Sequence, residues 1–269
     1  MKRDSSQTIL YAAKNCIEIE YAVIGHLLNS LDESFVKTVQ RVFDSKGRLV
    51  VTGIGKSAII GQKIVATLNS TGTPALFMHA ADAIHGDLGM VQEIDIVLCI
   101  SKSGETPEIR VLIPLIKSRR IQLIGMCAQI NSYLSKQSDY LLYTPIMKEA
   151  EPNNLAPTAS TTAQIVMGDA FAVSLLALRG FGPEDFARFH PGGSLGKQLY
   201  MKVDDFYQLH GRPNVRMETS LKETLITISS SRLGATAVLD HEEMLIGIIT
   251  DGDIRRFFEN ETELKGVSA

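Results

Sequence analysis

Short apolar runs alternate with segments of helical periodicity between residues 48 and 143. Runs of this length and continuity are typical of parallel strands that are buried on both faces. The apolar runs are Arg48–Thr52, Ala75–Met78, Asp95–Ile100, Ile121–Met126 and the weaker Tyr140–Tyr143, and helices are predicted at 57–70, 107–119 and 131–137. This order predicts an α/β fold, a three-layer αβα sandwich around a five-stranded parallel sheet. Ligands of such sheets bind at the carboxyl ends of the strands.

Further helices are predicted on both sides of this region, at 7–28, 33–45 and 159–180, with an irregular stretch after residue 182. A first domain is therefore expected over residues 1–200, and the polar segment 201–212 is interpreted as a linker. Residues 213–269 should form a second, small α+β unit. Its expected elements are a helix at 221–231, strands at 235–239 and 244–250, and a helix at 252–258.

The turn after the third predicted strand, from Ser101 to Glu108, combines hydroxyl side chains, a glycine and the start of a helix. Pro107 suits the first helical position and Thr106 the N-cap. Free amides and the dipole at a helix start favour an anion such as phosphate, and Ser101 and Ser103 add further donors. An ordinary capped strand-to-helix turn is the alternative that these residues leave open.

The turn after the first predicted strand, from Gly53 to Ala58, admits three interpretations. A Walker A loop fails, because it requires a glycine where Val50 stands. A dinucleotide-binding turn fits with an alanine in the third glycine position, but no acidic residue ends the next strand. We favour a sugar-phosphate loop in which Lys56 and Ser57 contact the ligand.

Two histidines and two aspartates lie within nine residues, from His79 to Asp87. Imidazole and carboxylate groups can bind metals, but the run matches no zinc-site spacing and lies on an irregular loop, so we predict no metal site. His85 is the candidate for acid–base chemistry, because an imidazole can change its charge near neutral pH. His79 is expected to pack at a strand end, and Asp82 to cap a helix.

Three more ionisable residues are candidates by their positions. Glu149 follows the last predicted strand and should reach the ligand edge, although the charged run around it also suits a solvated loop. Glu108 lies in a first helical turn, where a carboxylate also favours the helix dipole. His190 precedes the turn at 191–193 and could equally be a loop histidine without a catalytic role.

Charge and cysteine usage exclude several classes of protein. A net charge of −3 without a dense cluster of lysine and arginine argues against a nucleic-acid or membrane surface. The N-terminal residues contain no apolar leader, and the longest predicted helix carries Asp169, so we expect no membrane span. Cys16, Cys99 and Cys127 lack metal-site or disulfide spacing and are interpreted as thiols of a reducing compartment, the cytoplasm.

Five motifs occur in a fixed order along the chain, namely Thr71–Pro74, His85–Met90, Ser101–Glu105, Ala156–Thr162 and His190–Gly196. Together they resemble the sugar isomerase (SIS) domain of bacterial arabinose 5-phosphate isomerases, over roughly residues 5–200. The run Gly247–Arg256 resembles the end of a CBS motif. The family carries two CBS motifs, so a single or truncated one is expected at 213–269. The run His79–Asp82 also departs from the family pattern.

The resemblance implies an aldose–ketose isomerase that interconverts D-ribulose 5-phosphate and D-arabinose 5-phosphate through a cis-enediol. That reaction is the first step of Kdo biosynthesis, for lipopolysaccharide or capsule, and needs no metal or organic cofactor. The implied substrate- and phosphate-binding residues are Gly55, Ser57, Ser101, Ser103, Thr106, Thr158 and Ser160.

The resemblance also assigns the catalytic roles. Lys56 would stabilise the enediolate, and His85 and His190 would serve ring opening and proton transfer between oxygens. Glu108 and Glu149 are rival bases for the C1/C2 proton, and the sequence favours Glu149.

An assembly and a regulator are implied as well. We expect a homo-oligomer, a dimer at least and preferably a tetramer, with active sites shared between subunits, and a nucleotide or nucleotide-sugar regulator. Two alternatives stay open, a non-catalytic protein that senses a phosphosugar or nucleotide sugar, and an isomerase for another phosphosugar.

Overall fold

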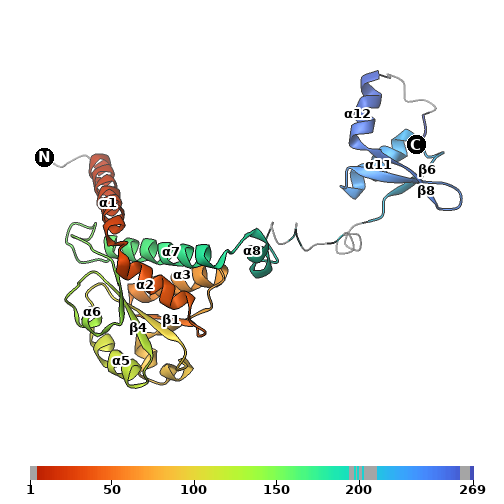
Figure 1. Cartoon of the computed structure of the whole chain (residues 1–269). Helices are drawn as coiled ribbons and strands as arrows, with labels where there is room; N and C mark the ends of the chain where they lie inside the picture. Colours follow the sequence, from red (N-terminus) through yellow and green to blue (C-terminus); the bar gives the residue numbers. More distant parts are fainter. Residues whose placement is uncertain (1–4, 194–196, 198, 200–201, 203–210, 261–266) are drawn as a thin grey trace. The chain divides into compact units, whose positions relative to one another are not determined.

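The computed structural model describes residues 5–193, 197, 199, 202, 211–260 and 267–269. The chain divides into two compact units, Met1–Leu195 and Gly196–Ala269 (Figure 1). The division lies close to the domain boundary expected at residue 200. Most of the predicted linker at 201–212 lies outside the described residues.

A five-stranded parallel sheet forms the centre of the first unit, with the strand order β2-β1-β3-β4-β5. The strands are β1 (Leu49–Gly53), β2 (Ala75–His79), β3 (Ile96–Ile100), β4 (Gln122–Cys127) and β5 (Tyr140–Tyr143). They confirm the five predicted runs to within one residue at each end. β1 and β3 are buried along their whole lengths, which explains their continuous apolar sequence.

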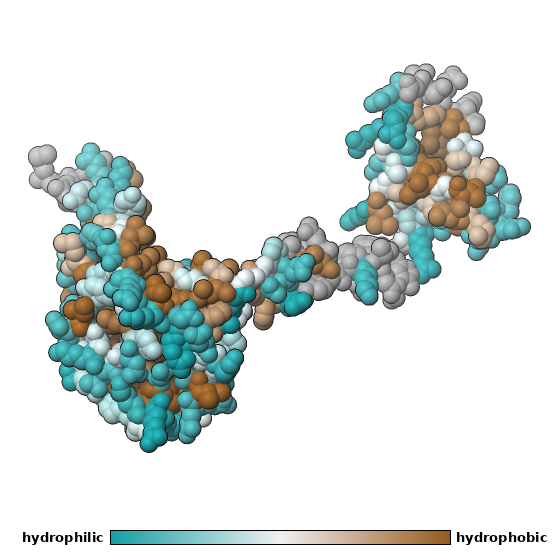
Figure 2. Space-filling view, viewed as in Figure 1, coloured by the Kyte–Doolittle hydropathy of each residue, from teal (hydrophilic) through white to brown (hydrophobic). Residues whose placement is uncertain are grey.

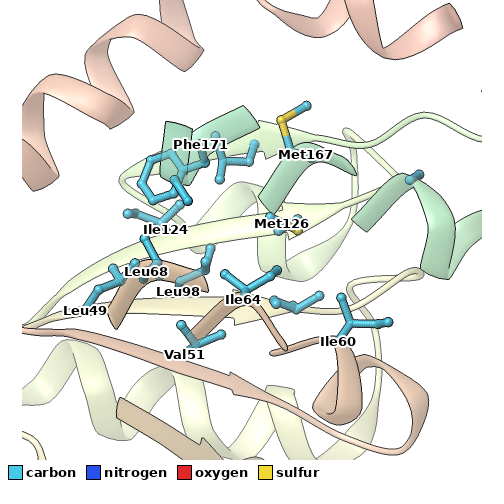
Figure 3. Packing of buried hydrophobic residues seen from close by; sticks show 14 of the residues in the cluster. Leu49, Val51, Ile60, Ile64, Leu68, Leu98, Ile124, Met126, Met167 and Phe171 are labelled. Carbon is cyan, nitrogen blue, oxygen red and sulfur yellow. The ribbon is translucent and has the colours of Figure 1, made fainter. Parts of the chain in front are cut away.

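Helices cover both faces of this sheet and complete the predicted three-layer αβα sandwich. One face carries α1 (Ser5–Leu27), α2 (Glu33–Phe43), α3 (Lys56–Ser70) and α7 (Ala159–Arg179), and the other carries α4 (Ala80–Ala83), α5 (Pro107–Ser118) and α6 (Tyr133–Gln137). Alternate residues of each strand enter separate cores. Val51 and Leu98 pack with Ile64 and Phe171 on the first face (Figure 3), whereas Val97 packs on the second.

The helix α7 lies at the centre of its layer, in contact with α1, α2 and α3. By length and composition alone it is apolar enough to cross a membrane, and the charge of Asp169 does not prevent this. Its place in the core accounts for that composition. Met167, Phe171 and Leu175 are buried, and Asp169 pairs with Lys63 of α3.

Two local expectations are wrong. The stretch after residue 182 contains a helix, α8 (Pro183–Phe189), whose start is stabilised because the Asp185 carboxylate accepts the N–H of Gly182 at 3.0 Å. Asp82 lies inside α4 instead of capping it, since the chain turns directly from His79 at the end of β2 into this helix.

The second unit is a small sheet with two helices. Its elements are β6 (Asn214–Arg216), α11 (Leu221–Ser231), β7 (Ala235–Leu239), β8 (Leu245–Thr250) and α12 (Asp251–Asn260). Both predicted helices and both predicted strands are present to within two residues, whereas β6 was missed because three residues carry no periodic signal. Leu221, Ile228 and Ile254 form its core.

Candidate active site

A cavity lies at the carboxyl ends of β1 and β3, where the direction of the strand order reverses. The chain leaves β1 for β2 on one side and returns to β3 on the other side of β1. Open parallel sheets bind ligands at such a switch point. The cavity measures about 230 Å³ and is lined by Ile54, Lys56, Ser57, Ile100, Ser101, Lys102, Ser103, Thr106, Pro157 and Ser160. Six of the predicted site residues therefore meet here, namely Lys56, Ser57, Ser101, Ser103, Thr106 and Ser160.

Three helices begin at this cavity. Lys56 is the first residue of α3, Thr106 directly precedes α5, and Ser160 lies in the first turn of α7. A helix start carries a partial positive charge and N–H groups without intrahelical partners. Among the described residues that line the cavity, none is acidic. The arrangement therefore favours an anionic ligand.

The loop after β3 keeps hydroxyl donors available for such a ligand. Ser101 Oγ accepts the N–H of Gly104 at 3.1 Å, and Ser103 Oγ accepts the N–H of Glu105 at 3.2 Å. Each serine therefore still has its own O–H to donate. Thr106 stands at the N-cap position of α5, but its side chain caps no amide, and its buried Oγ1 has no hydrogen-bond partner among the described residues. An unpaired buried hydroxyl needs an explanation, and an anion bound in the cavity would supply one.

The loop after β1 forms another wall. Gly55 has a φ of +59°, which residues with side chains rarely adopt, and a Cβ there would meet only open space. A ligand can therefore approach this backbone closely. The exposed Lys56 has no hydrogen bond or ion pair with the described residues. Ser57 Oγ donates to Oε1 of Gln164 at 3.2 Å, which joins the starts of α3 and α7.

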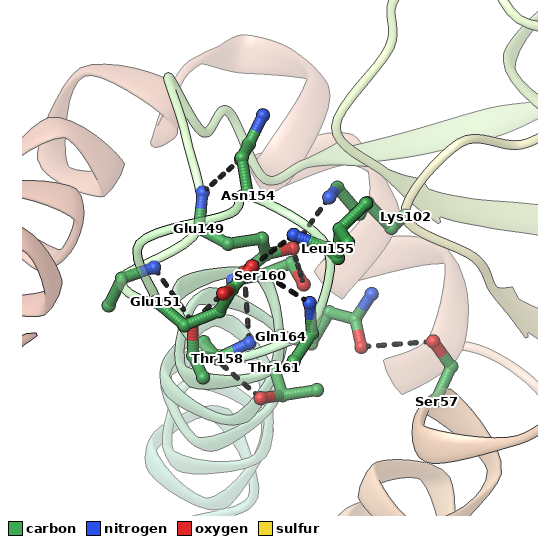
Figure 4. Close-up of polar contacts among 12 residues, drawn as sticks. Ser57, Lys102, Glu149, Glu151, Asn154, Leu155, Thr158, Ser160, Thr161 and Gln164 are labelled. Atoms are coloured by element: carbon green, nitrogen blue, oxygen red, sulfur yellow. Dashed lines mark hydrogen bonds and ion pairs between the residues drawn. The ribbon is translucent and has the colours of Figure 1, made fainter.

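Glu149 lies behind the cavity wall with its side chain fully buried. Its Oε1 accepts Ser160 Oγ and Lys102 Nζ, each at 2.6 Å (Figure 4). Its Oε2 accepts the N–H groups of Thr158 and Ser160 at 2.9 and 3.0 Å, and Thr158 Oγ1 at 3.3 Å. Burial alone would raise the pKa of Glu149, but these bonds outweigh it and lower the pKa to about 2. The carboxylate therefore stays charged and anchors the start of α7.

This anchor occupies hydroxyl groups that the resemblance assigns to substrate. Ser160 lines the cavity but donates its O–H to Glu149, and Thr158 is not among the lining residues. Lys102, by contrast, lines the cavity and was missed by sequence reasoning. The one signal for it was a cation between two serines in a loop expected to bind an anion.

Besides Glu149, three other predicted catalytic residues do not line the cavity. Glu108 is half-buried in the first turn of α5, without a hydrogen-bond partner in the described part of the chain. His85 is exposed on the turn between α4 and the short helix η2 (Asp87–Met90). His190 follows α8, and its Nε2 lies 3.1 Å from Oγ of Ser70 at the end of α3 opposite Lys56.

The described residues offer neither a metal-binding cluster nor a reactive thiol. Within the described ranges, no group of three or more His, Cys, Asp or Glu side chains could hold a metal ion. Cys99 and Cys127 are buried free thiols. Burial raises the pKa of Cys99 to about 12 and raises that of Cys127 as well, so both stay protonated at neutral pH.

Comparison with known proteins adds a family to this geometry. Residues 42–174 match the SIS domain. The whole chain is 44% identical over 269 residues to the arabinose 5-phosphate isomerase KdsD of Pseudomonas aeruginosa and covers 82% of that protein. The chain belongs to the arabinose 5-phosphate isomerase family. The isomerase KpsF of Escherichia coli is 42% identical over 271 residues, which cover 99% of this chain and 83% of that protein.

A solved structure of similar sequence also has a similar fold. An Escherichia coli protein in complex with arabinose 5-phosphate matches with a TM-score of 0.67 and 36% identity, over 70% of this chain and 100% of its own. The first unit therefore has the SIS fold that the motifs predicted. The comparisons do not confirm the CBS assignment of the second unit, which stays a prediction.

Proposed function

We propose that this protein is an arabinose 5-phosphate isomerase, which interconverts D-ribulose 5-phosphate and D-arabinose 5-phosphate through a cis-enediol. The observation that carries the proposal is the cavity at the switch point, where three helix starts meet hydroxyl groups that still have a proton to donate, in a member of this family. A phosphate anchor of this kind holds a small sugar in one register, so that remote binding energy positions the reacting carbons.

The phosphate group would bind at the start of α5. Ser101 and Ser103 have O–H groups to donate, and the orphan hydroxyl of Thr106 would gain the partner it lacks. Gly55 leaves room for the ligand against the backbone, while Ser57 and Ser160 line the same cavity. Thr158 would contribute only by fixing the start of α7.

Proton transfer between C1 and C2 requires a base with a free lone pair facing the substrate, and the two carboxylate candidates are Glu108 and Glu149. The five donors around Glu149 fill the positions at which its two oxygens could accept a proton. A carboxylate with a pKa of about 2 is also a weak base. We therefore assign the proton transfer to Glu108, in place of the residue that the sequence favoured.

The developing enediolate needs a cation, and Lys56 supplies one at the cavity without an internal partner to hold it. His85 would move protons between the sugar oxygens from the loop beyond β2. His190 is separated from the cavity of its own chain by the length of α3, so His190 of the partner subunit would complete the site.

The first unit also has an apolar surface that could contact a second copy of this chain (Figure 2). Tyr21 and Leu28 are 78% and 71% exposed, and they border a cavity of about 320 Å³ between α1 and α7. A second apolar cavity, of about 400 Å³, lies between α2 and α7. Exposed apolar patches of this kind mark protein interfaces. We propose a homo-oligomer, at least a dimer and preferably a tetramer, built on this surface.

The second unit would be a single or truncated CBS motif that binds a nucleotide or nucleotide sugar as a regulator. Its β8 exposes Leu245 and Ile248, which supports pairing with another such unit. A place in Kdo biosynthesis, for lipopolysaccharide or capsule, and a cytoplasmic location follow from the proposed reaction. The buried thiols of Cys99 and Cys127 suit a reducing compartment.

The direct test follows D-ribulose 5-phosphate by NMR with the full chain in deuterated water. We expect D-arabinose 5-phosphate to form with solvent deuterium at the carbon that receives the proton. The isosteric variant Thr106→Val should raise the KM about tenfold, because it leaves one phosphate oxygen without a donor. Binding of the sugar phosphate without turnover would contradict the proposal and support a non-catalytic sensor.

A further inference from the structure

Lys102 lines the cavity, and its ammonium group forms an ion pair with the buried carboxylate of Glu149. Its Nζ lies 2.6 Å from Oε1 of Glu149, and the lysine side chain is 39% exposed whereas the glutamate side chain is fully buried. An ammonium group has three N–H donors, of which Glu149 takes one. No other partner for this group occurs in the described part of the chain, so the remaining donors are left for a ligand.

The backbone at both ends of this ion pair is held by hydrogen bonds. The carbonyl of Lys102 accepts the N–H of Ala128 at 3.0 Å, and the N–H of Glu149 donates to Asn154 Oδ1 at 2.7 Å. Withdrawing the lysine would leave the carboxylate buried without its cation, which is unfavourable. The ammonium is therefore positioned before any ligand arrives.

We propose that Lys102 is a phosphate-binding residue of the cavity and that Glu149 is a positioning residue that acts through it. Ser101 and Ser103 flank the lysine, so the three side chains can bind oxygens of one phosphate. The identity of the sugar rests on the proposed function. The binding of a phosphate group by Lys102 does not depend on that function.

The pair also solves an electrostatic problem. A lone carboxylate behind the wall would repel a phosphate dianion across a poorly solvated gap. Lys102 neutralises that carboxylate, and together with Lys56 it leaves the cavity positive. Removing Lys102 therefore has two effects, the loss of a donor and the exposure of the ligand to the charge of Glu149.

The test measures the binding of inorganic phosphate to the full chain by calorimetry, with unfolding temperatures as a check on folding. We expect Lys102→Met to weaken phosphate binding at least tenfold and to raise the KM for D-ribulose 5-phosphate by a similar factor, with a smaller change in kcat. Lys102→Arg, which keeps the charge, should bind phosphate within about threefold of the wild type.

The double variant Lys102→Met/Glu149→Gln should bind phosphate at least threefold more tightly than Lys102→Met alone, because the uncompensated charge is gone. The matched control is Lys117→Met. Lys117 is also 39% exposed and paired with an aspartate, Asp139, at 3.4 Å, but it lies near the other end of α5. It should leave phosphate binding unchanged.

Wild-type phosphate affinity in a folded Lys102→Met variant would overturn the proposal. A double variant that binds phosphate no more tightly than Lys102→Met would also contradict the proposal, because Glu149 would then exert no repulsion for the lysine to neutralise. If the wild type binds phosphate and Lys102→Met does not, but neither converts the sugar, the inference about Lys102 stands and the proposed function fails.

Discussion

The Nε2 atom of His190 and the Oγ atom of Ser70 lie 3.1 Å apart, at the end of α3 farthest from the cavity. The 15 residues of α3 separate Lys56 from this point by about 20 Å, at 1.5 Å per residue. Stacking of the His190 ring on Phe186, with the ring centroids 3.9 Å apart, holds the imidazole there. This position is the basis for the proposal that His190 serves the site of a partner subunit.

Subunit mixing tests this relationship. Lys56→Ala and His190→Ala should each be inactive, but hetero-oligomers formed by refolding them together should regain about a quarter of the wild-type activity. In each mixed dimer, one of the two sites then contains both an intact Lys56 and an intact His190. Mixing Lys56→Ala with Glu108→Gln is the control and should regain nothing, because both residues serve the same site from one chain. A mixture with His190→Ala that stays inactive would contradict the shared site.

Substitution of Glu108 should affect mainly kcat, whereas substitution of Glu149 should affect mainly stability. Glu108→Gln should lower kcat by a factor of about 10² to 10⁴ without changing the unfolding temperature, because it removes a base whose carboxylate forms no hydrogen bond or ion pair with the described residues. Glu149→Gln should lower the unfolding temperature and reduce kcat less. Steady-state kinetics and thermal unfolding measure both effects, with the exposed Glu33→Gln as control. The reverse pattern would restore Glu149 as the base.

The stability that Glu149 contributes should depend on pH. Its pKa is lowered to about 2 in the folded chain, below the value of about 4.3 for an unperturbed glutamate. The contribution is therefore complete above the unfolded pKa and is lost as the pH falls toward 2. Urea unfolding should show a wild-type advantage over Glu149→Gln on the order of 2 kcal/mol at pH 7, which shrinks below pH 4.5. An advantage of the same size at pH 3 would be the contrary result.

A second buried carboxylate should matter for stability alone. Asp95 precedes β3 and is 2% exposed; it accepts the N–H groups of Arg48 and Gln92 at 2.8 and 2.9 Å and Nη2 of Arg48 at 2.7 Å. Burial alone would raise the pKa of Asp95, but these bonds lower it. Asp95→Asn should destabilise the fold by about 3 kcal/mol.

The activity of the folded Asp95→Asn variant should be unchanged, because the residue lies at the amino end of β3, opposite the cavity. The exposed Asp82→Asn should change the free energy of unfolding by less than about 0.5 kcal/mol. Urea unfolding and kinetics measure both variants. A folded Asp95→Asn protein with reduced kcat would show that the two edges of the sheet are coupled.

Several features of the fold and site were readable from local sequence. Continuous apolar runs identify β1 and β3, because strands covered on both faces have no polar side to alternate with. The loop from Ser101 to Thr106 was predicted to lie at the ligand edge, because its hydroxyls, glycine and helix start lie within a few residues, and the structure places Ser101, Ser103 and Thr106 at the cavity. Capping was less predictable. Thr106 has the right residue type and position, yet its hydroxyl caps nothing.

By itself the sequence determined the order of strands and helices, and with it the edge at which ligands bind, since these depend on interactions between near neighbours in the chain. Only the tertiary structure decided that Glu149 forms an ion pair with Lys102. It also decided that His190 lies beside Ser70, from which it is separated by 120 residues in the sequence. The charge state of a carboxylate depends on which donors the folded chain brings to it. A residue's neighbours across a cavity follow from the packing of layers, which no local pattern specifies.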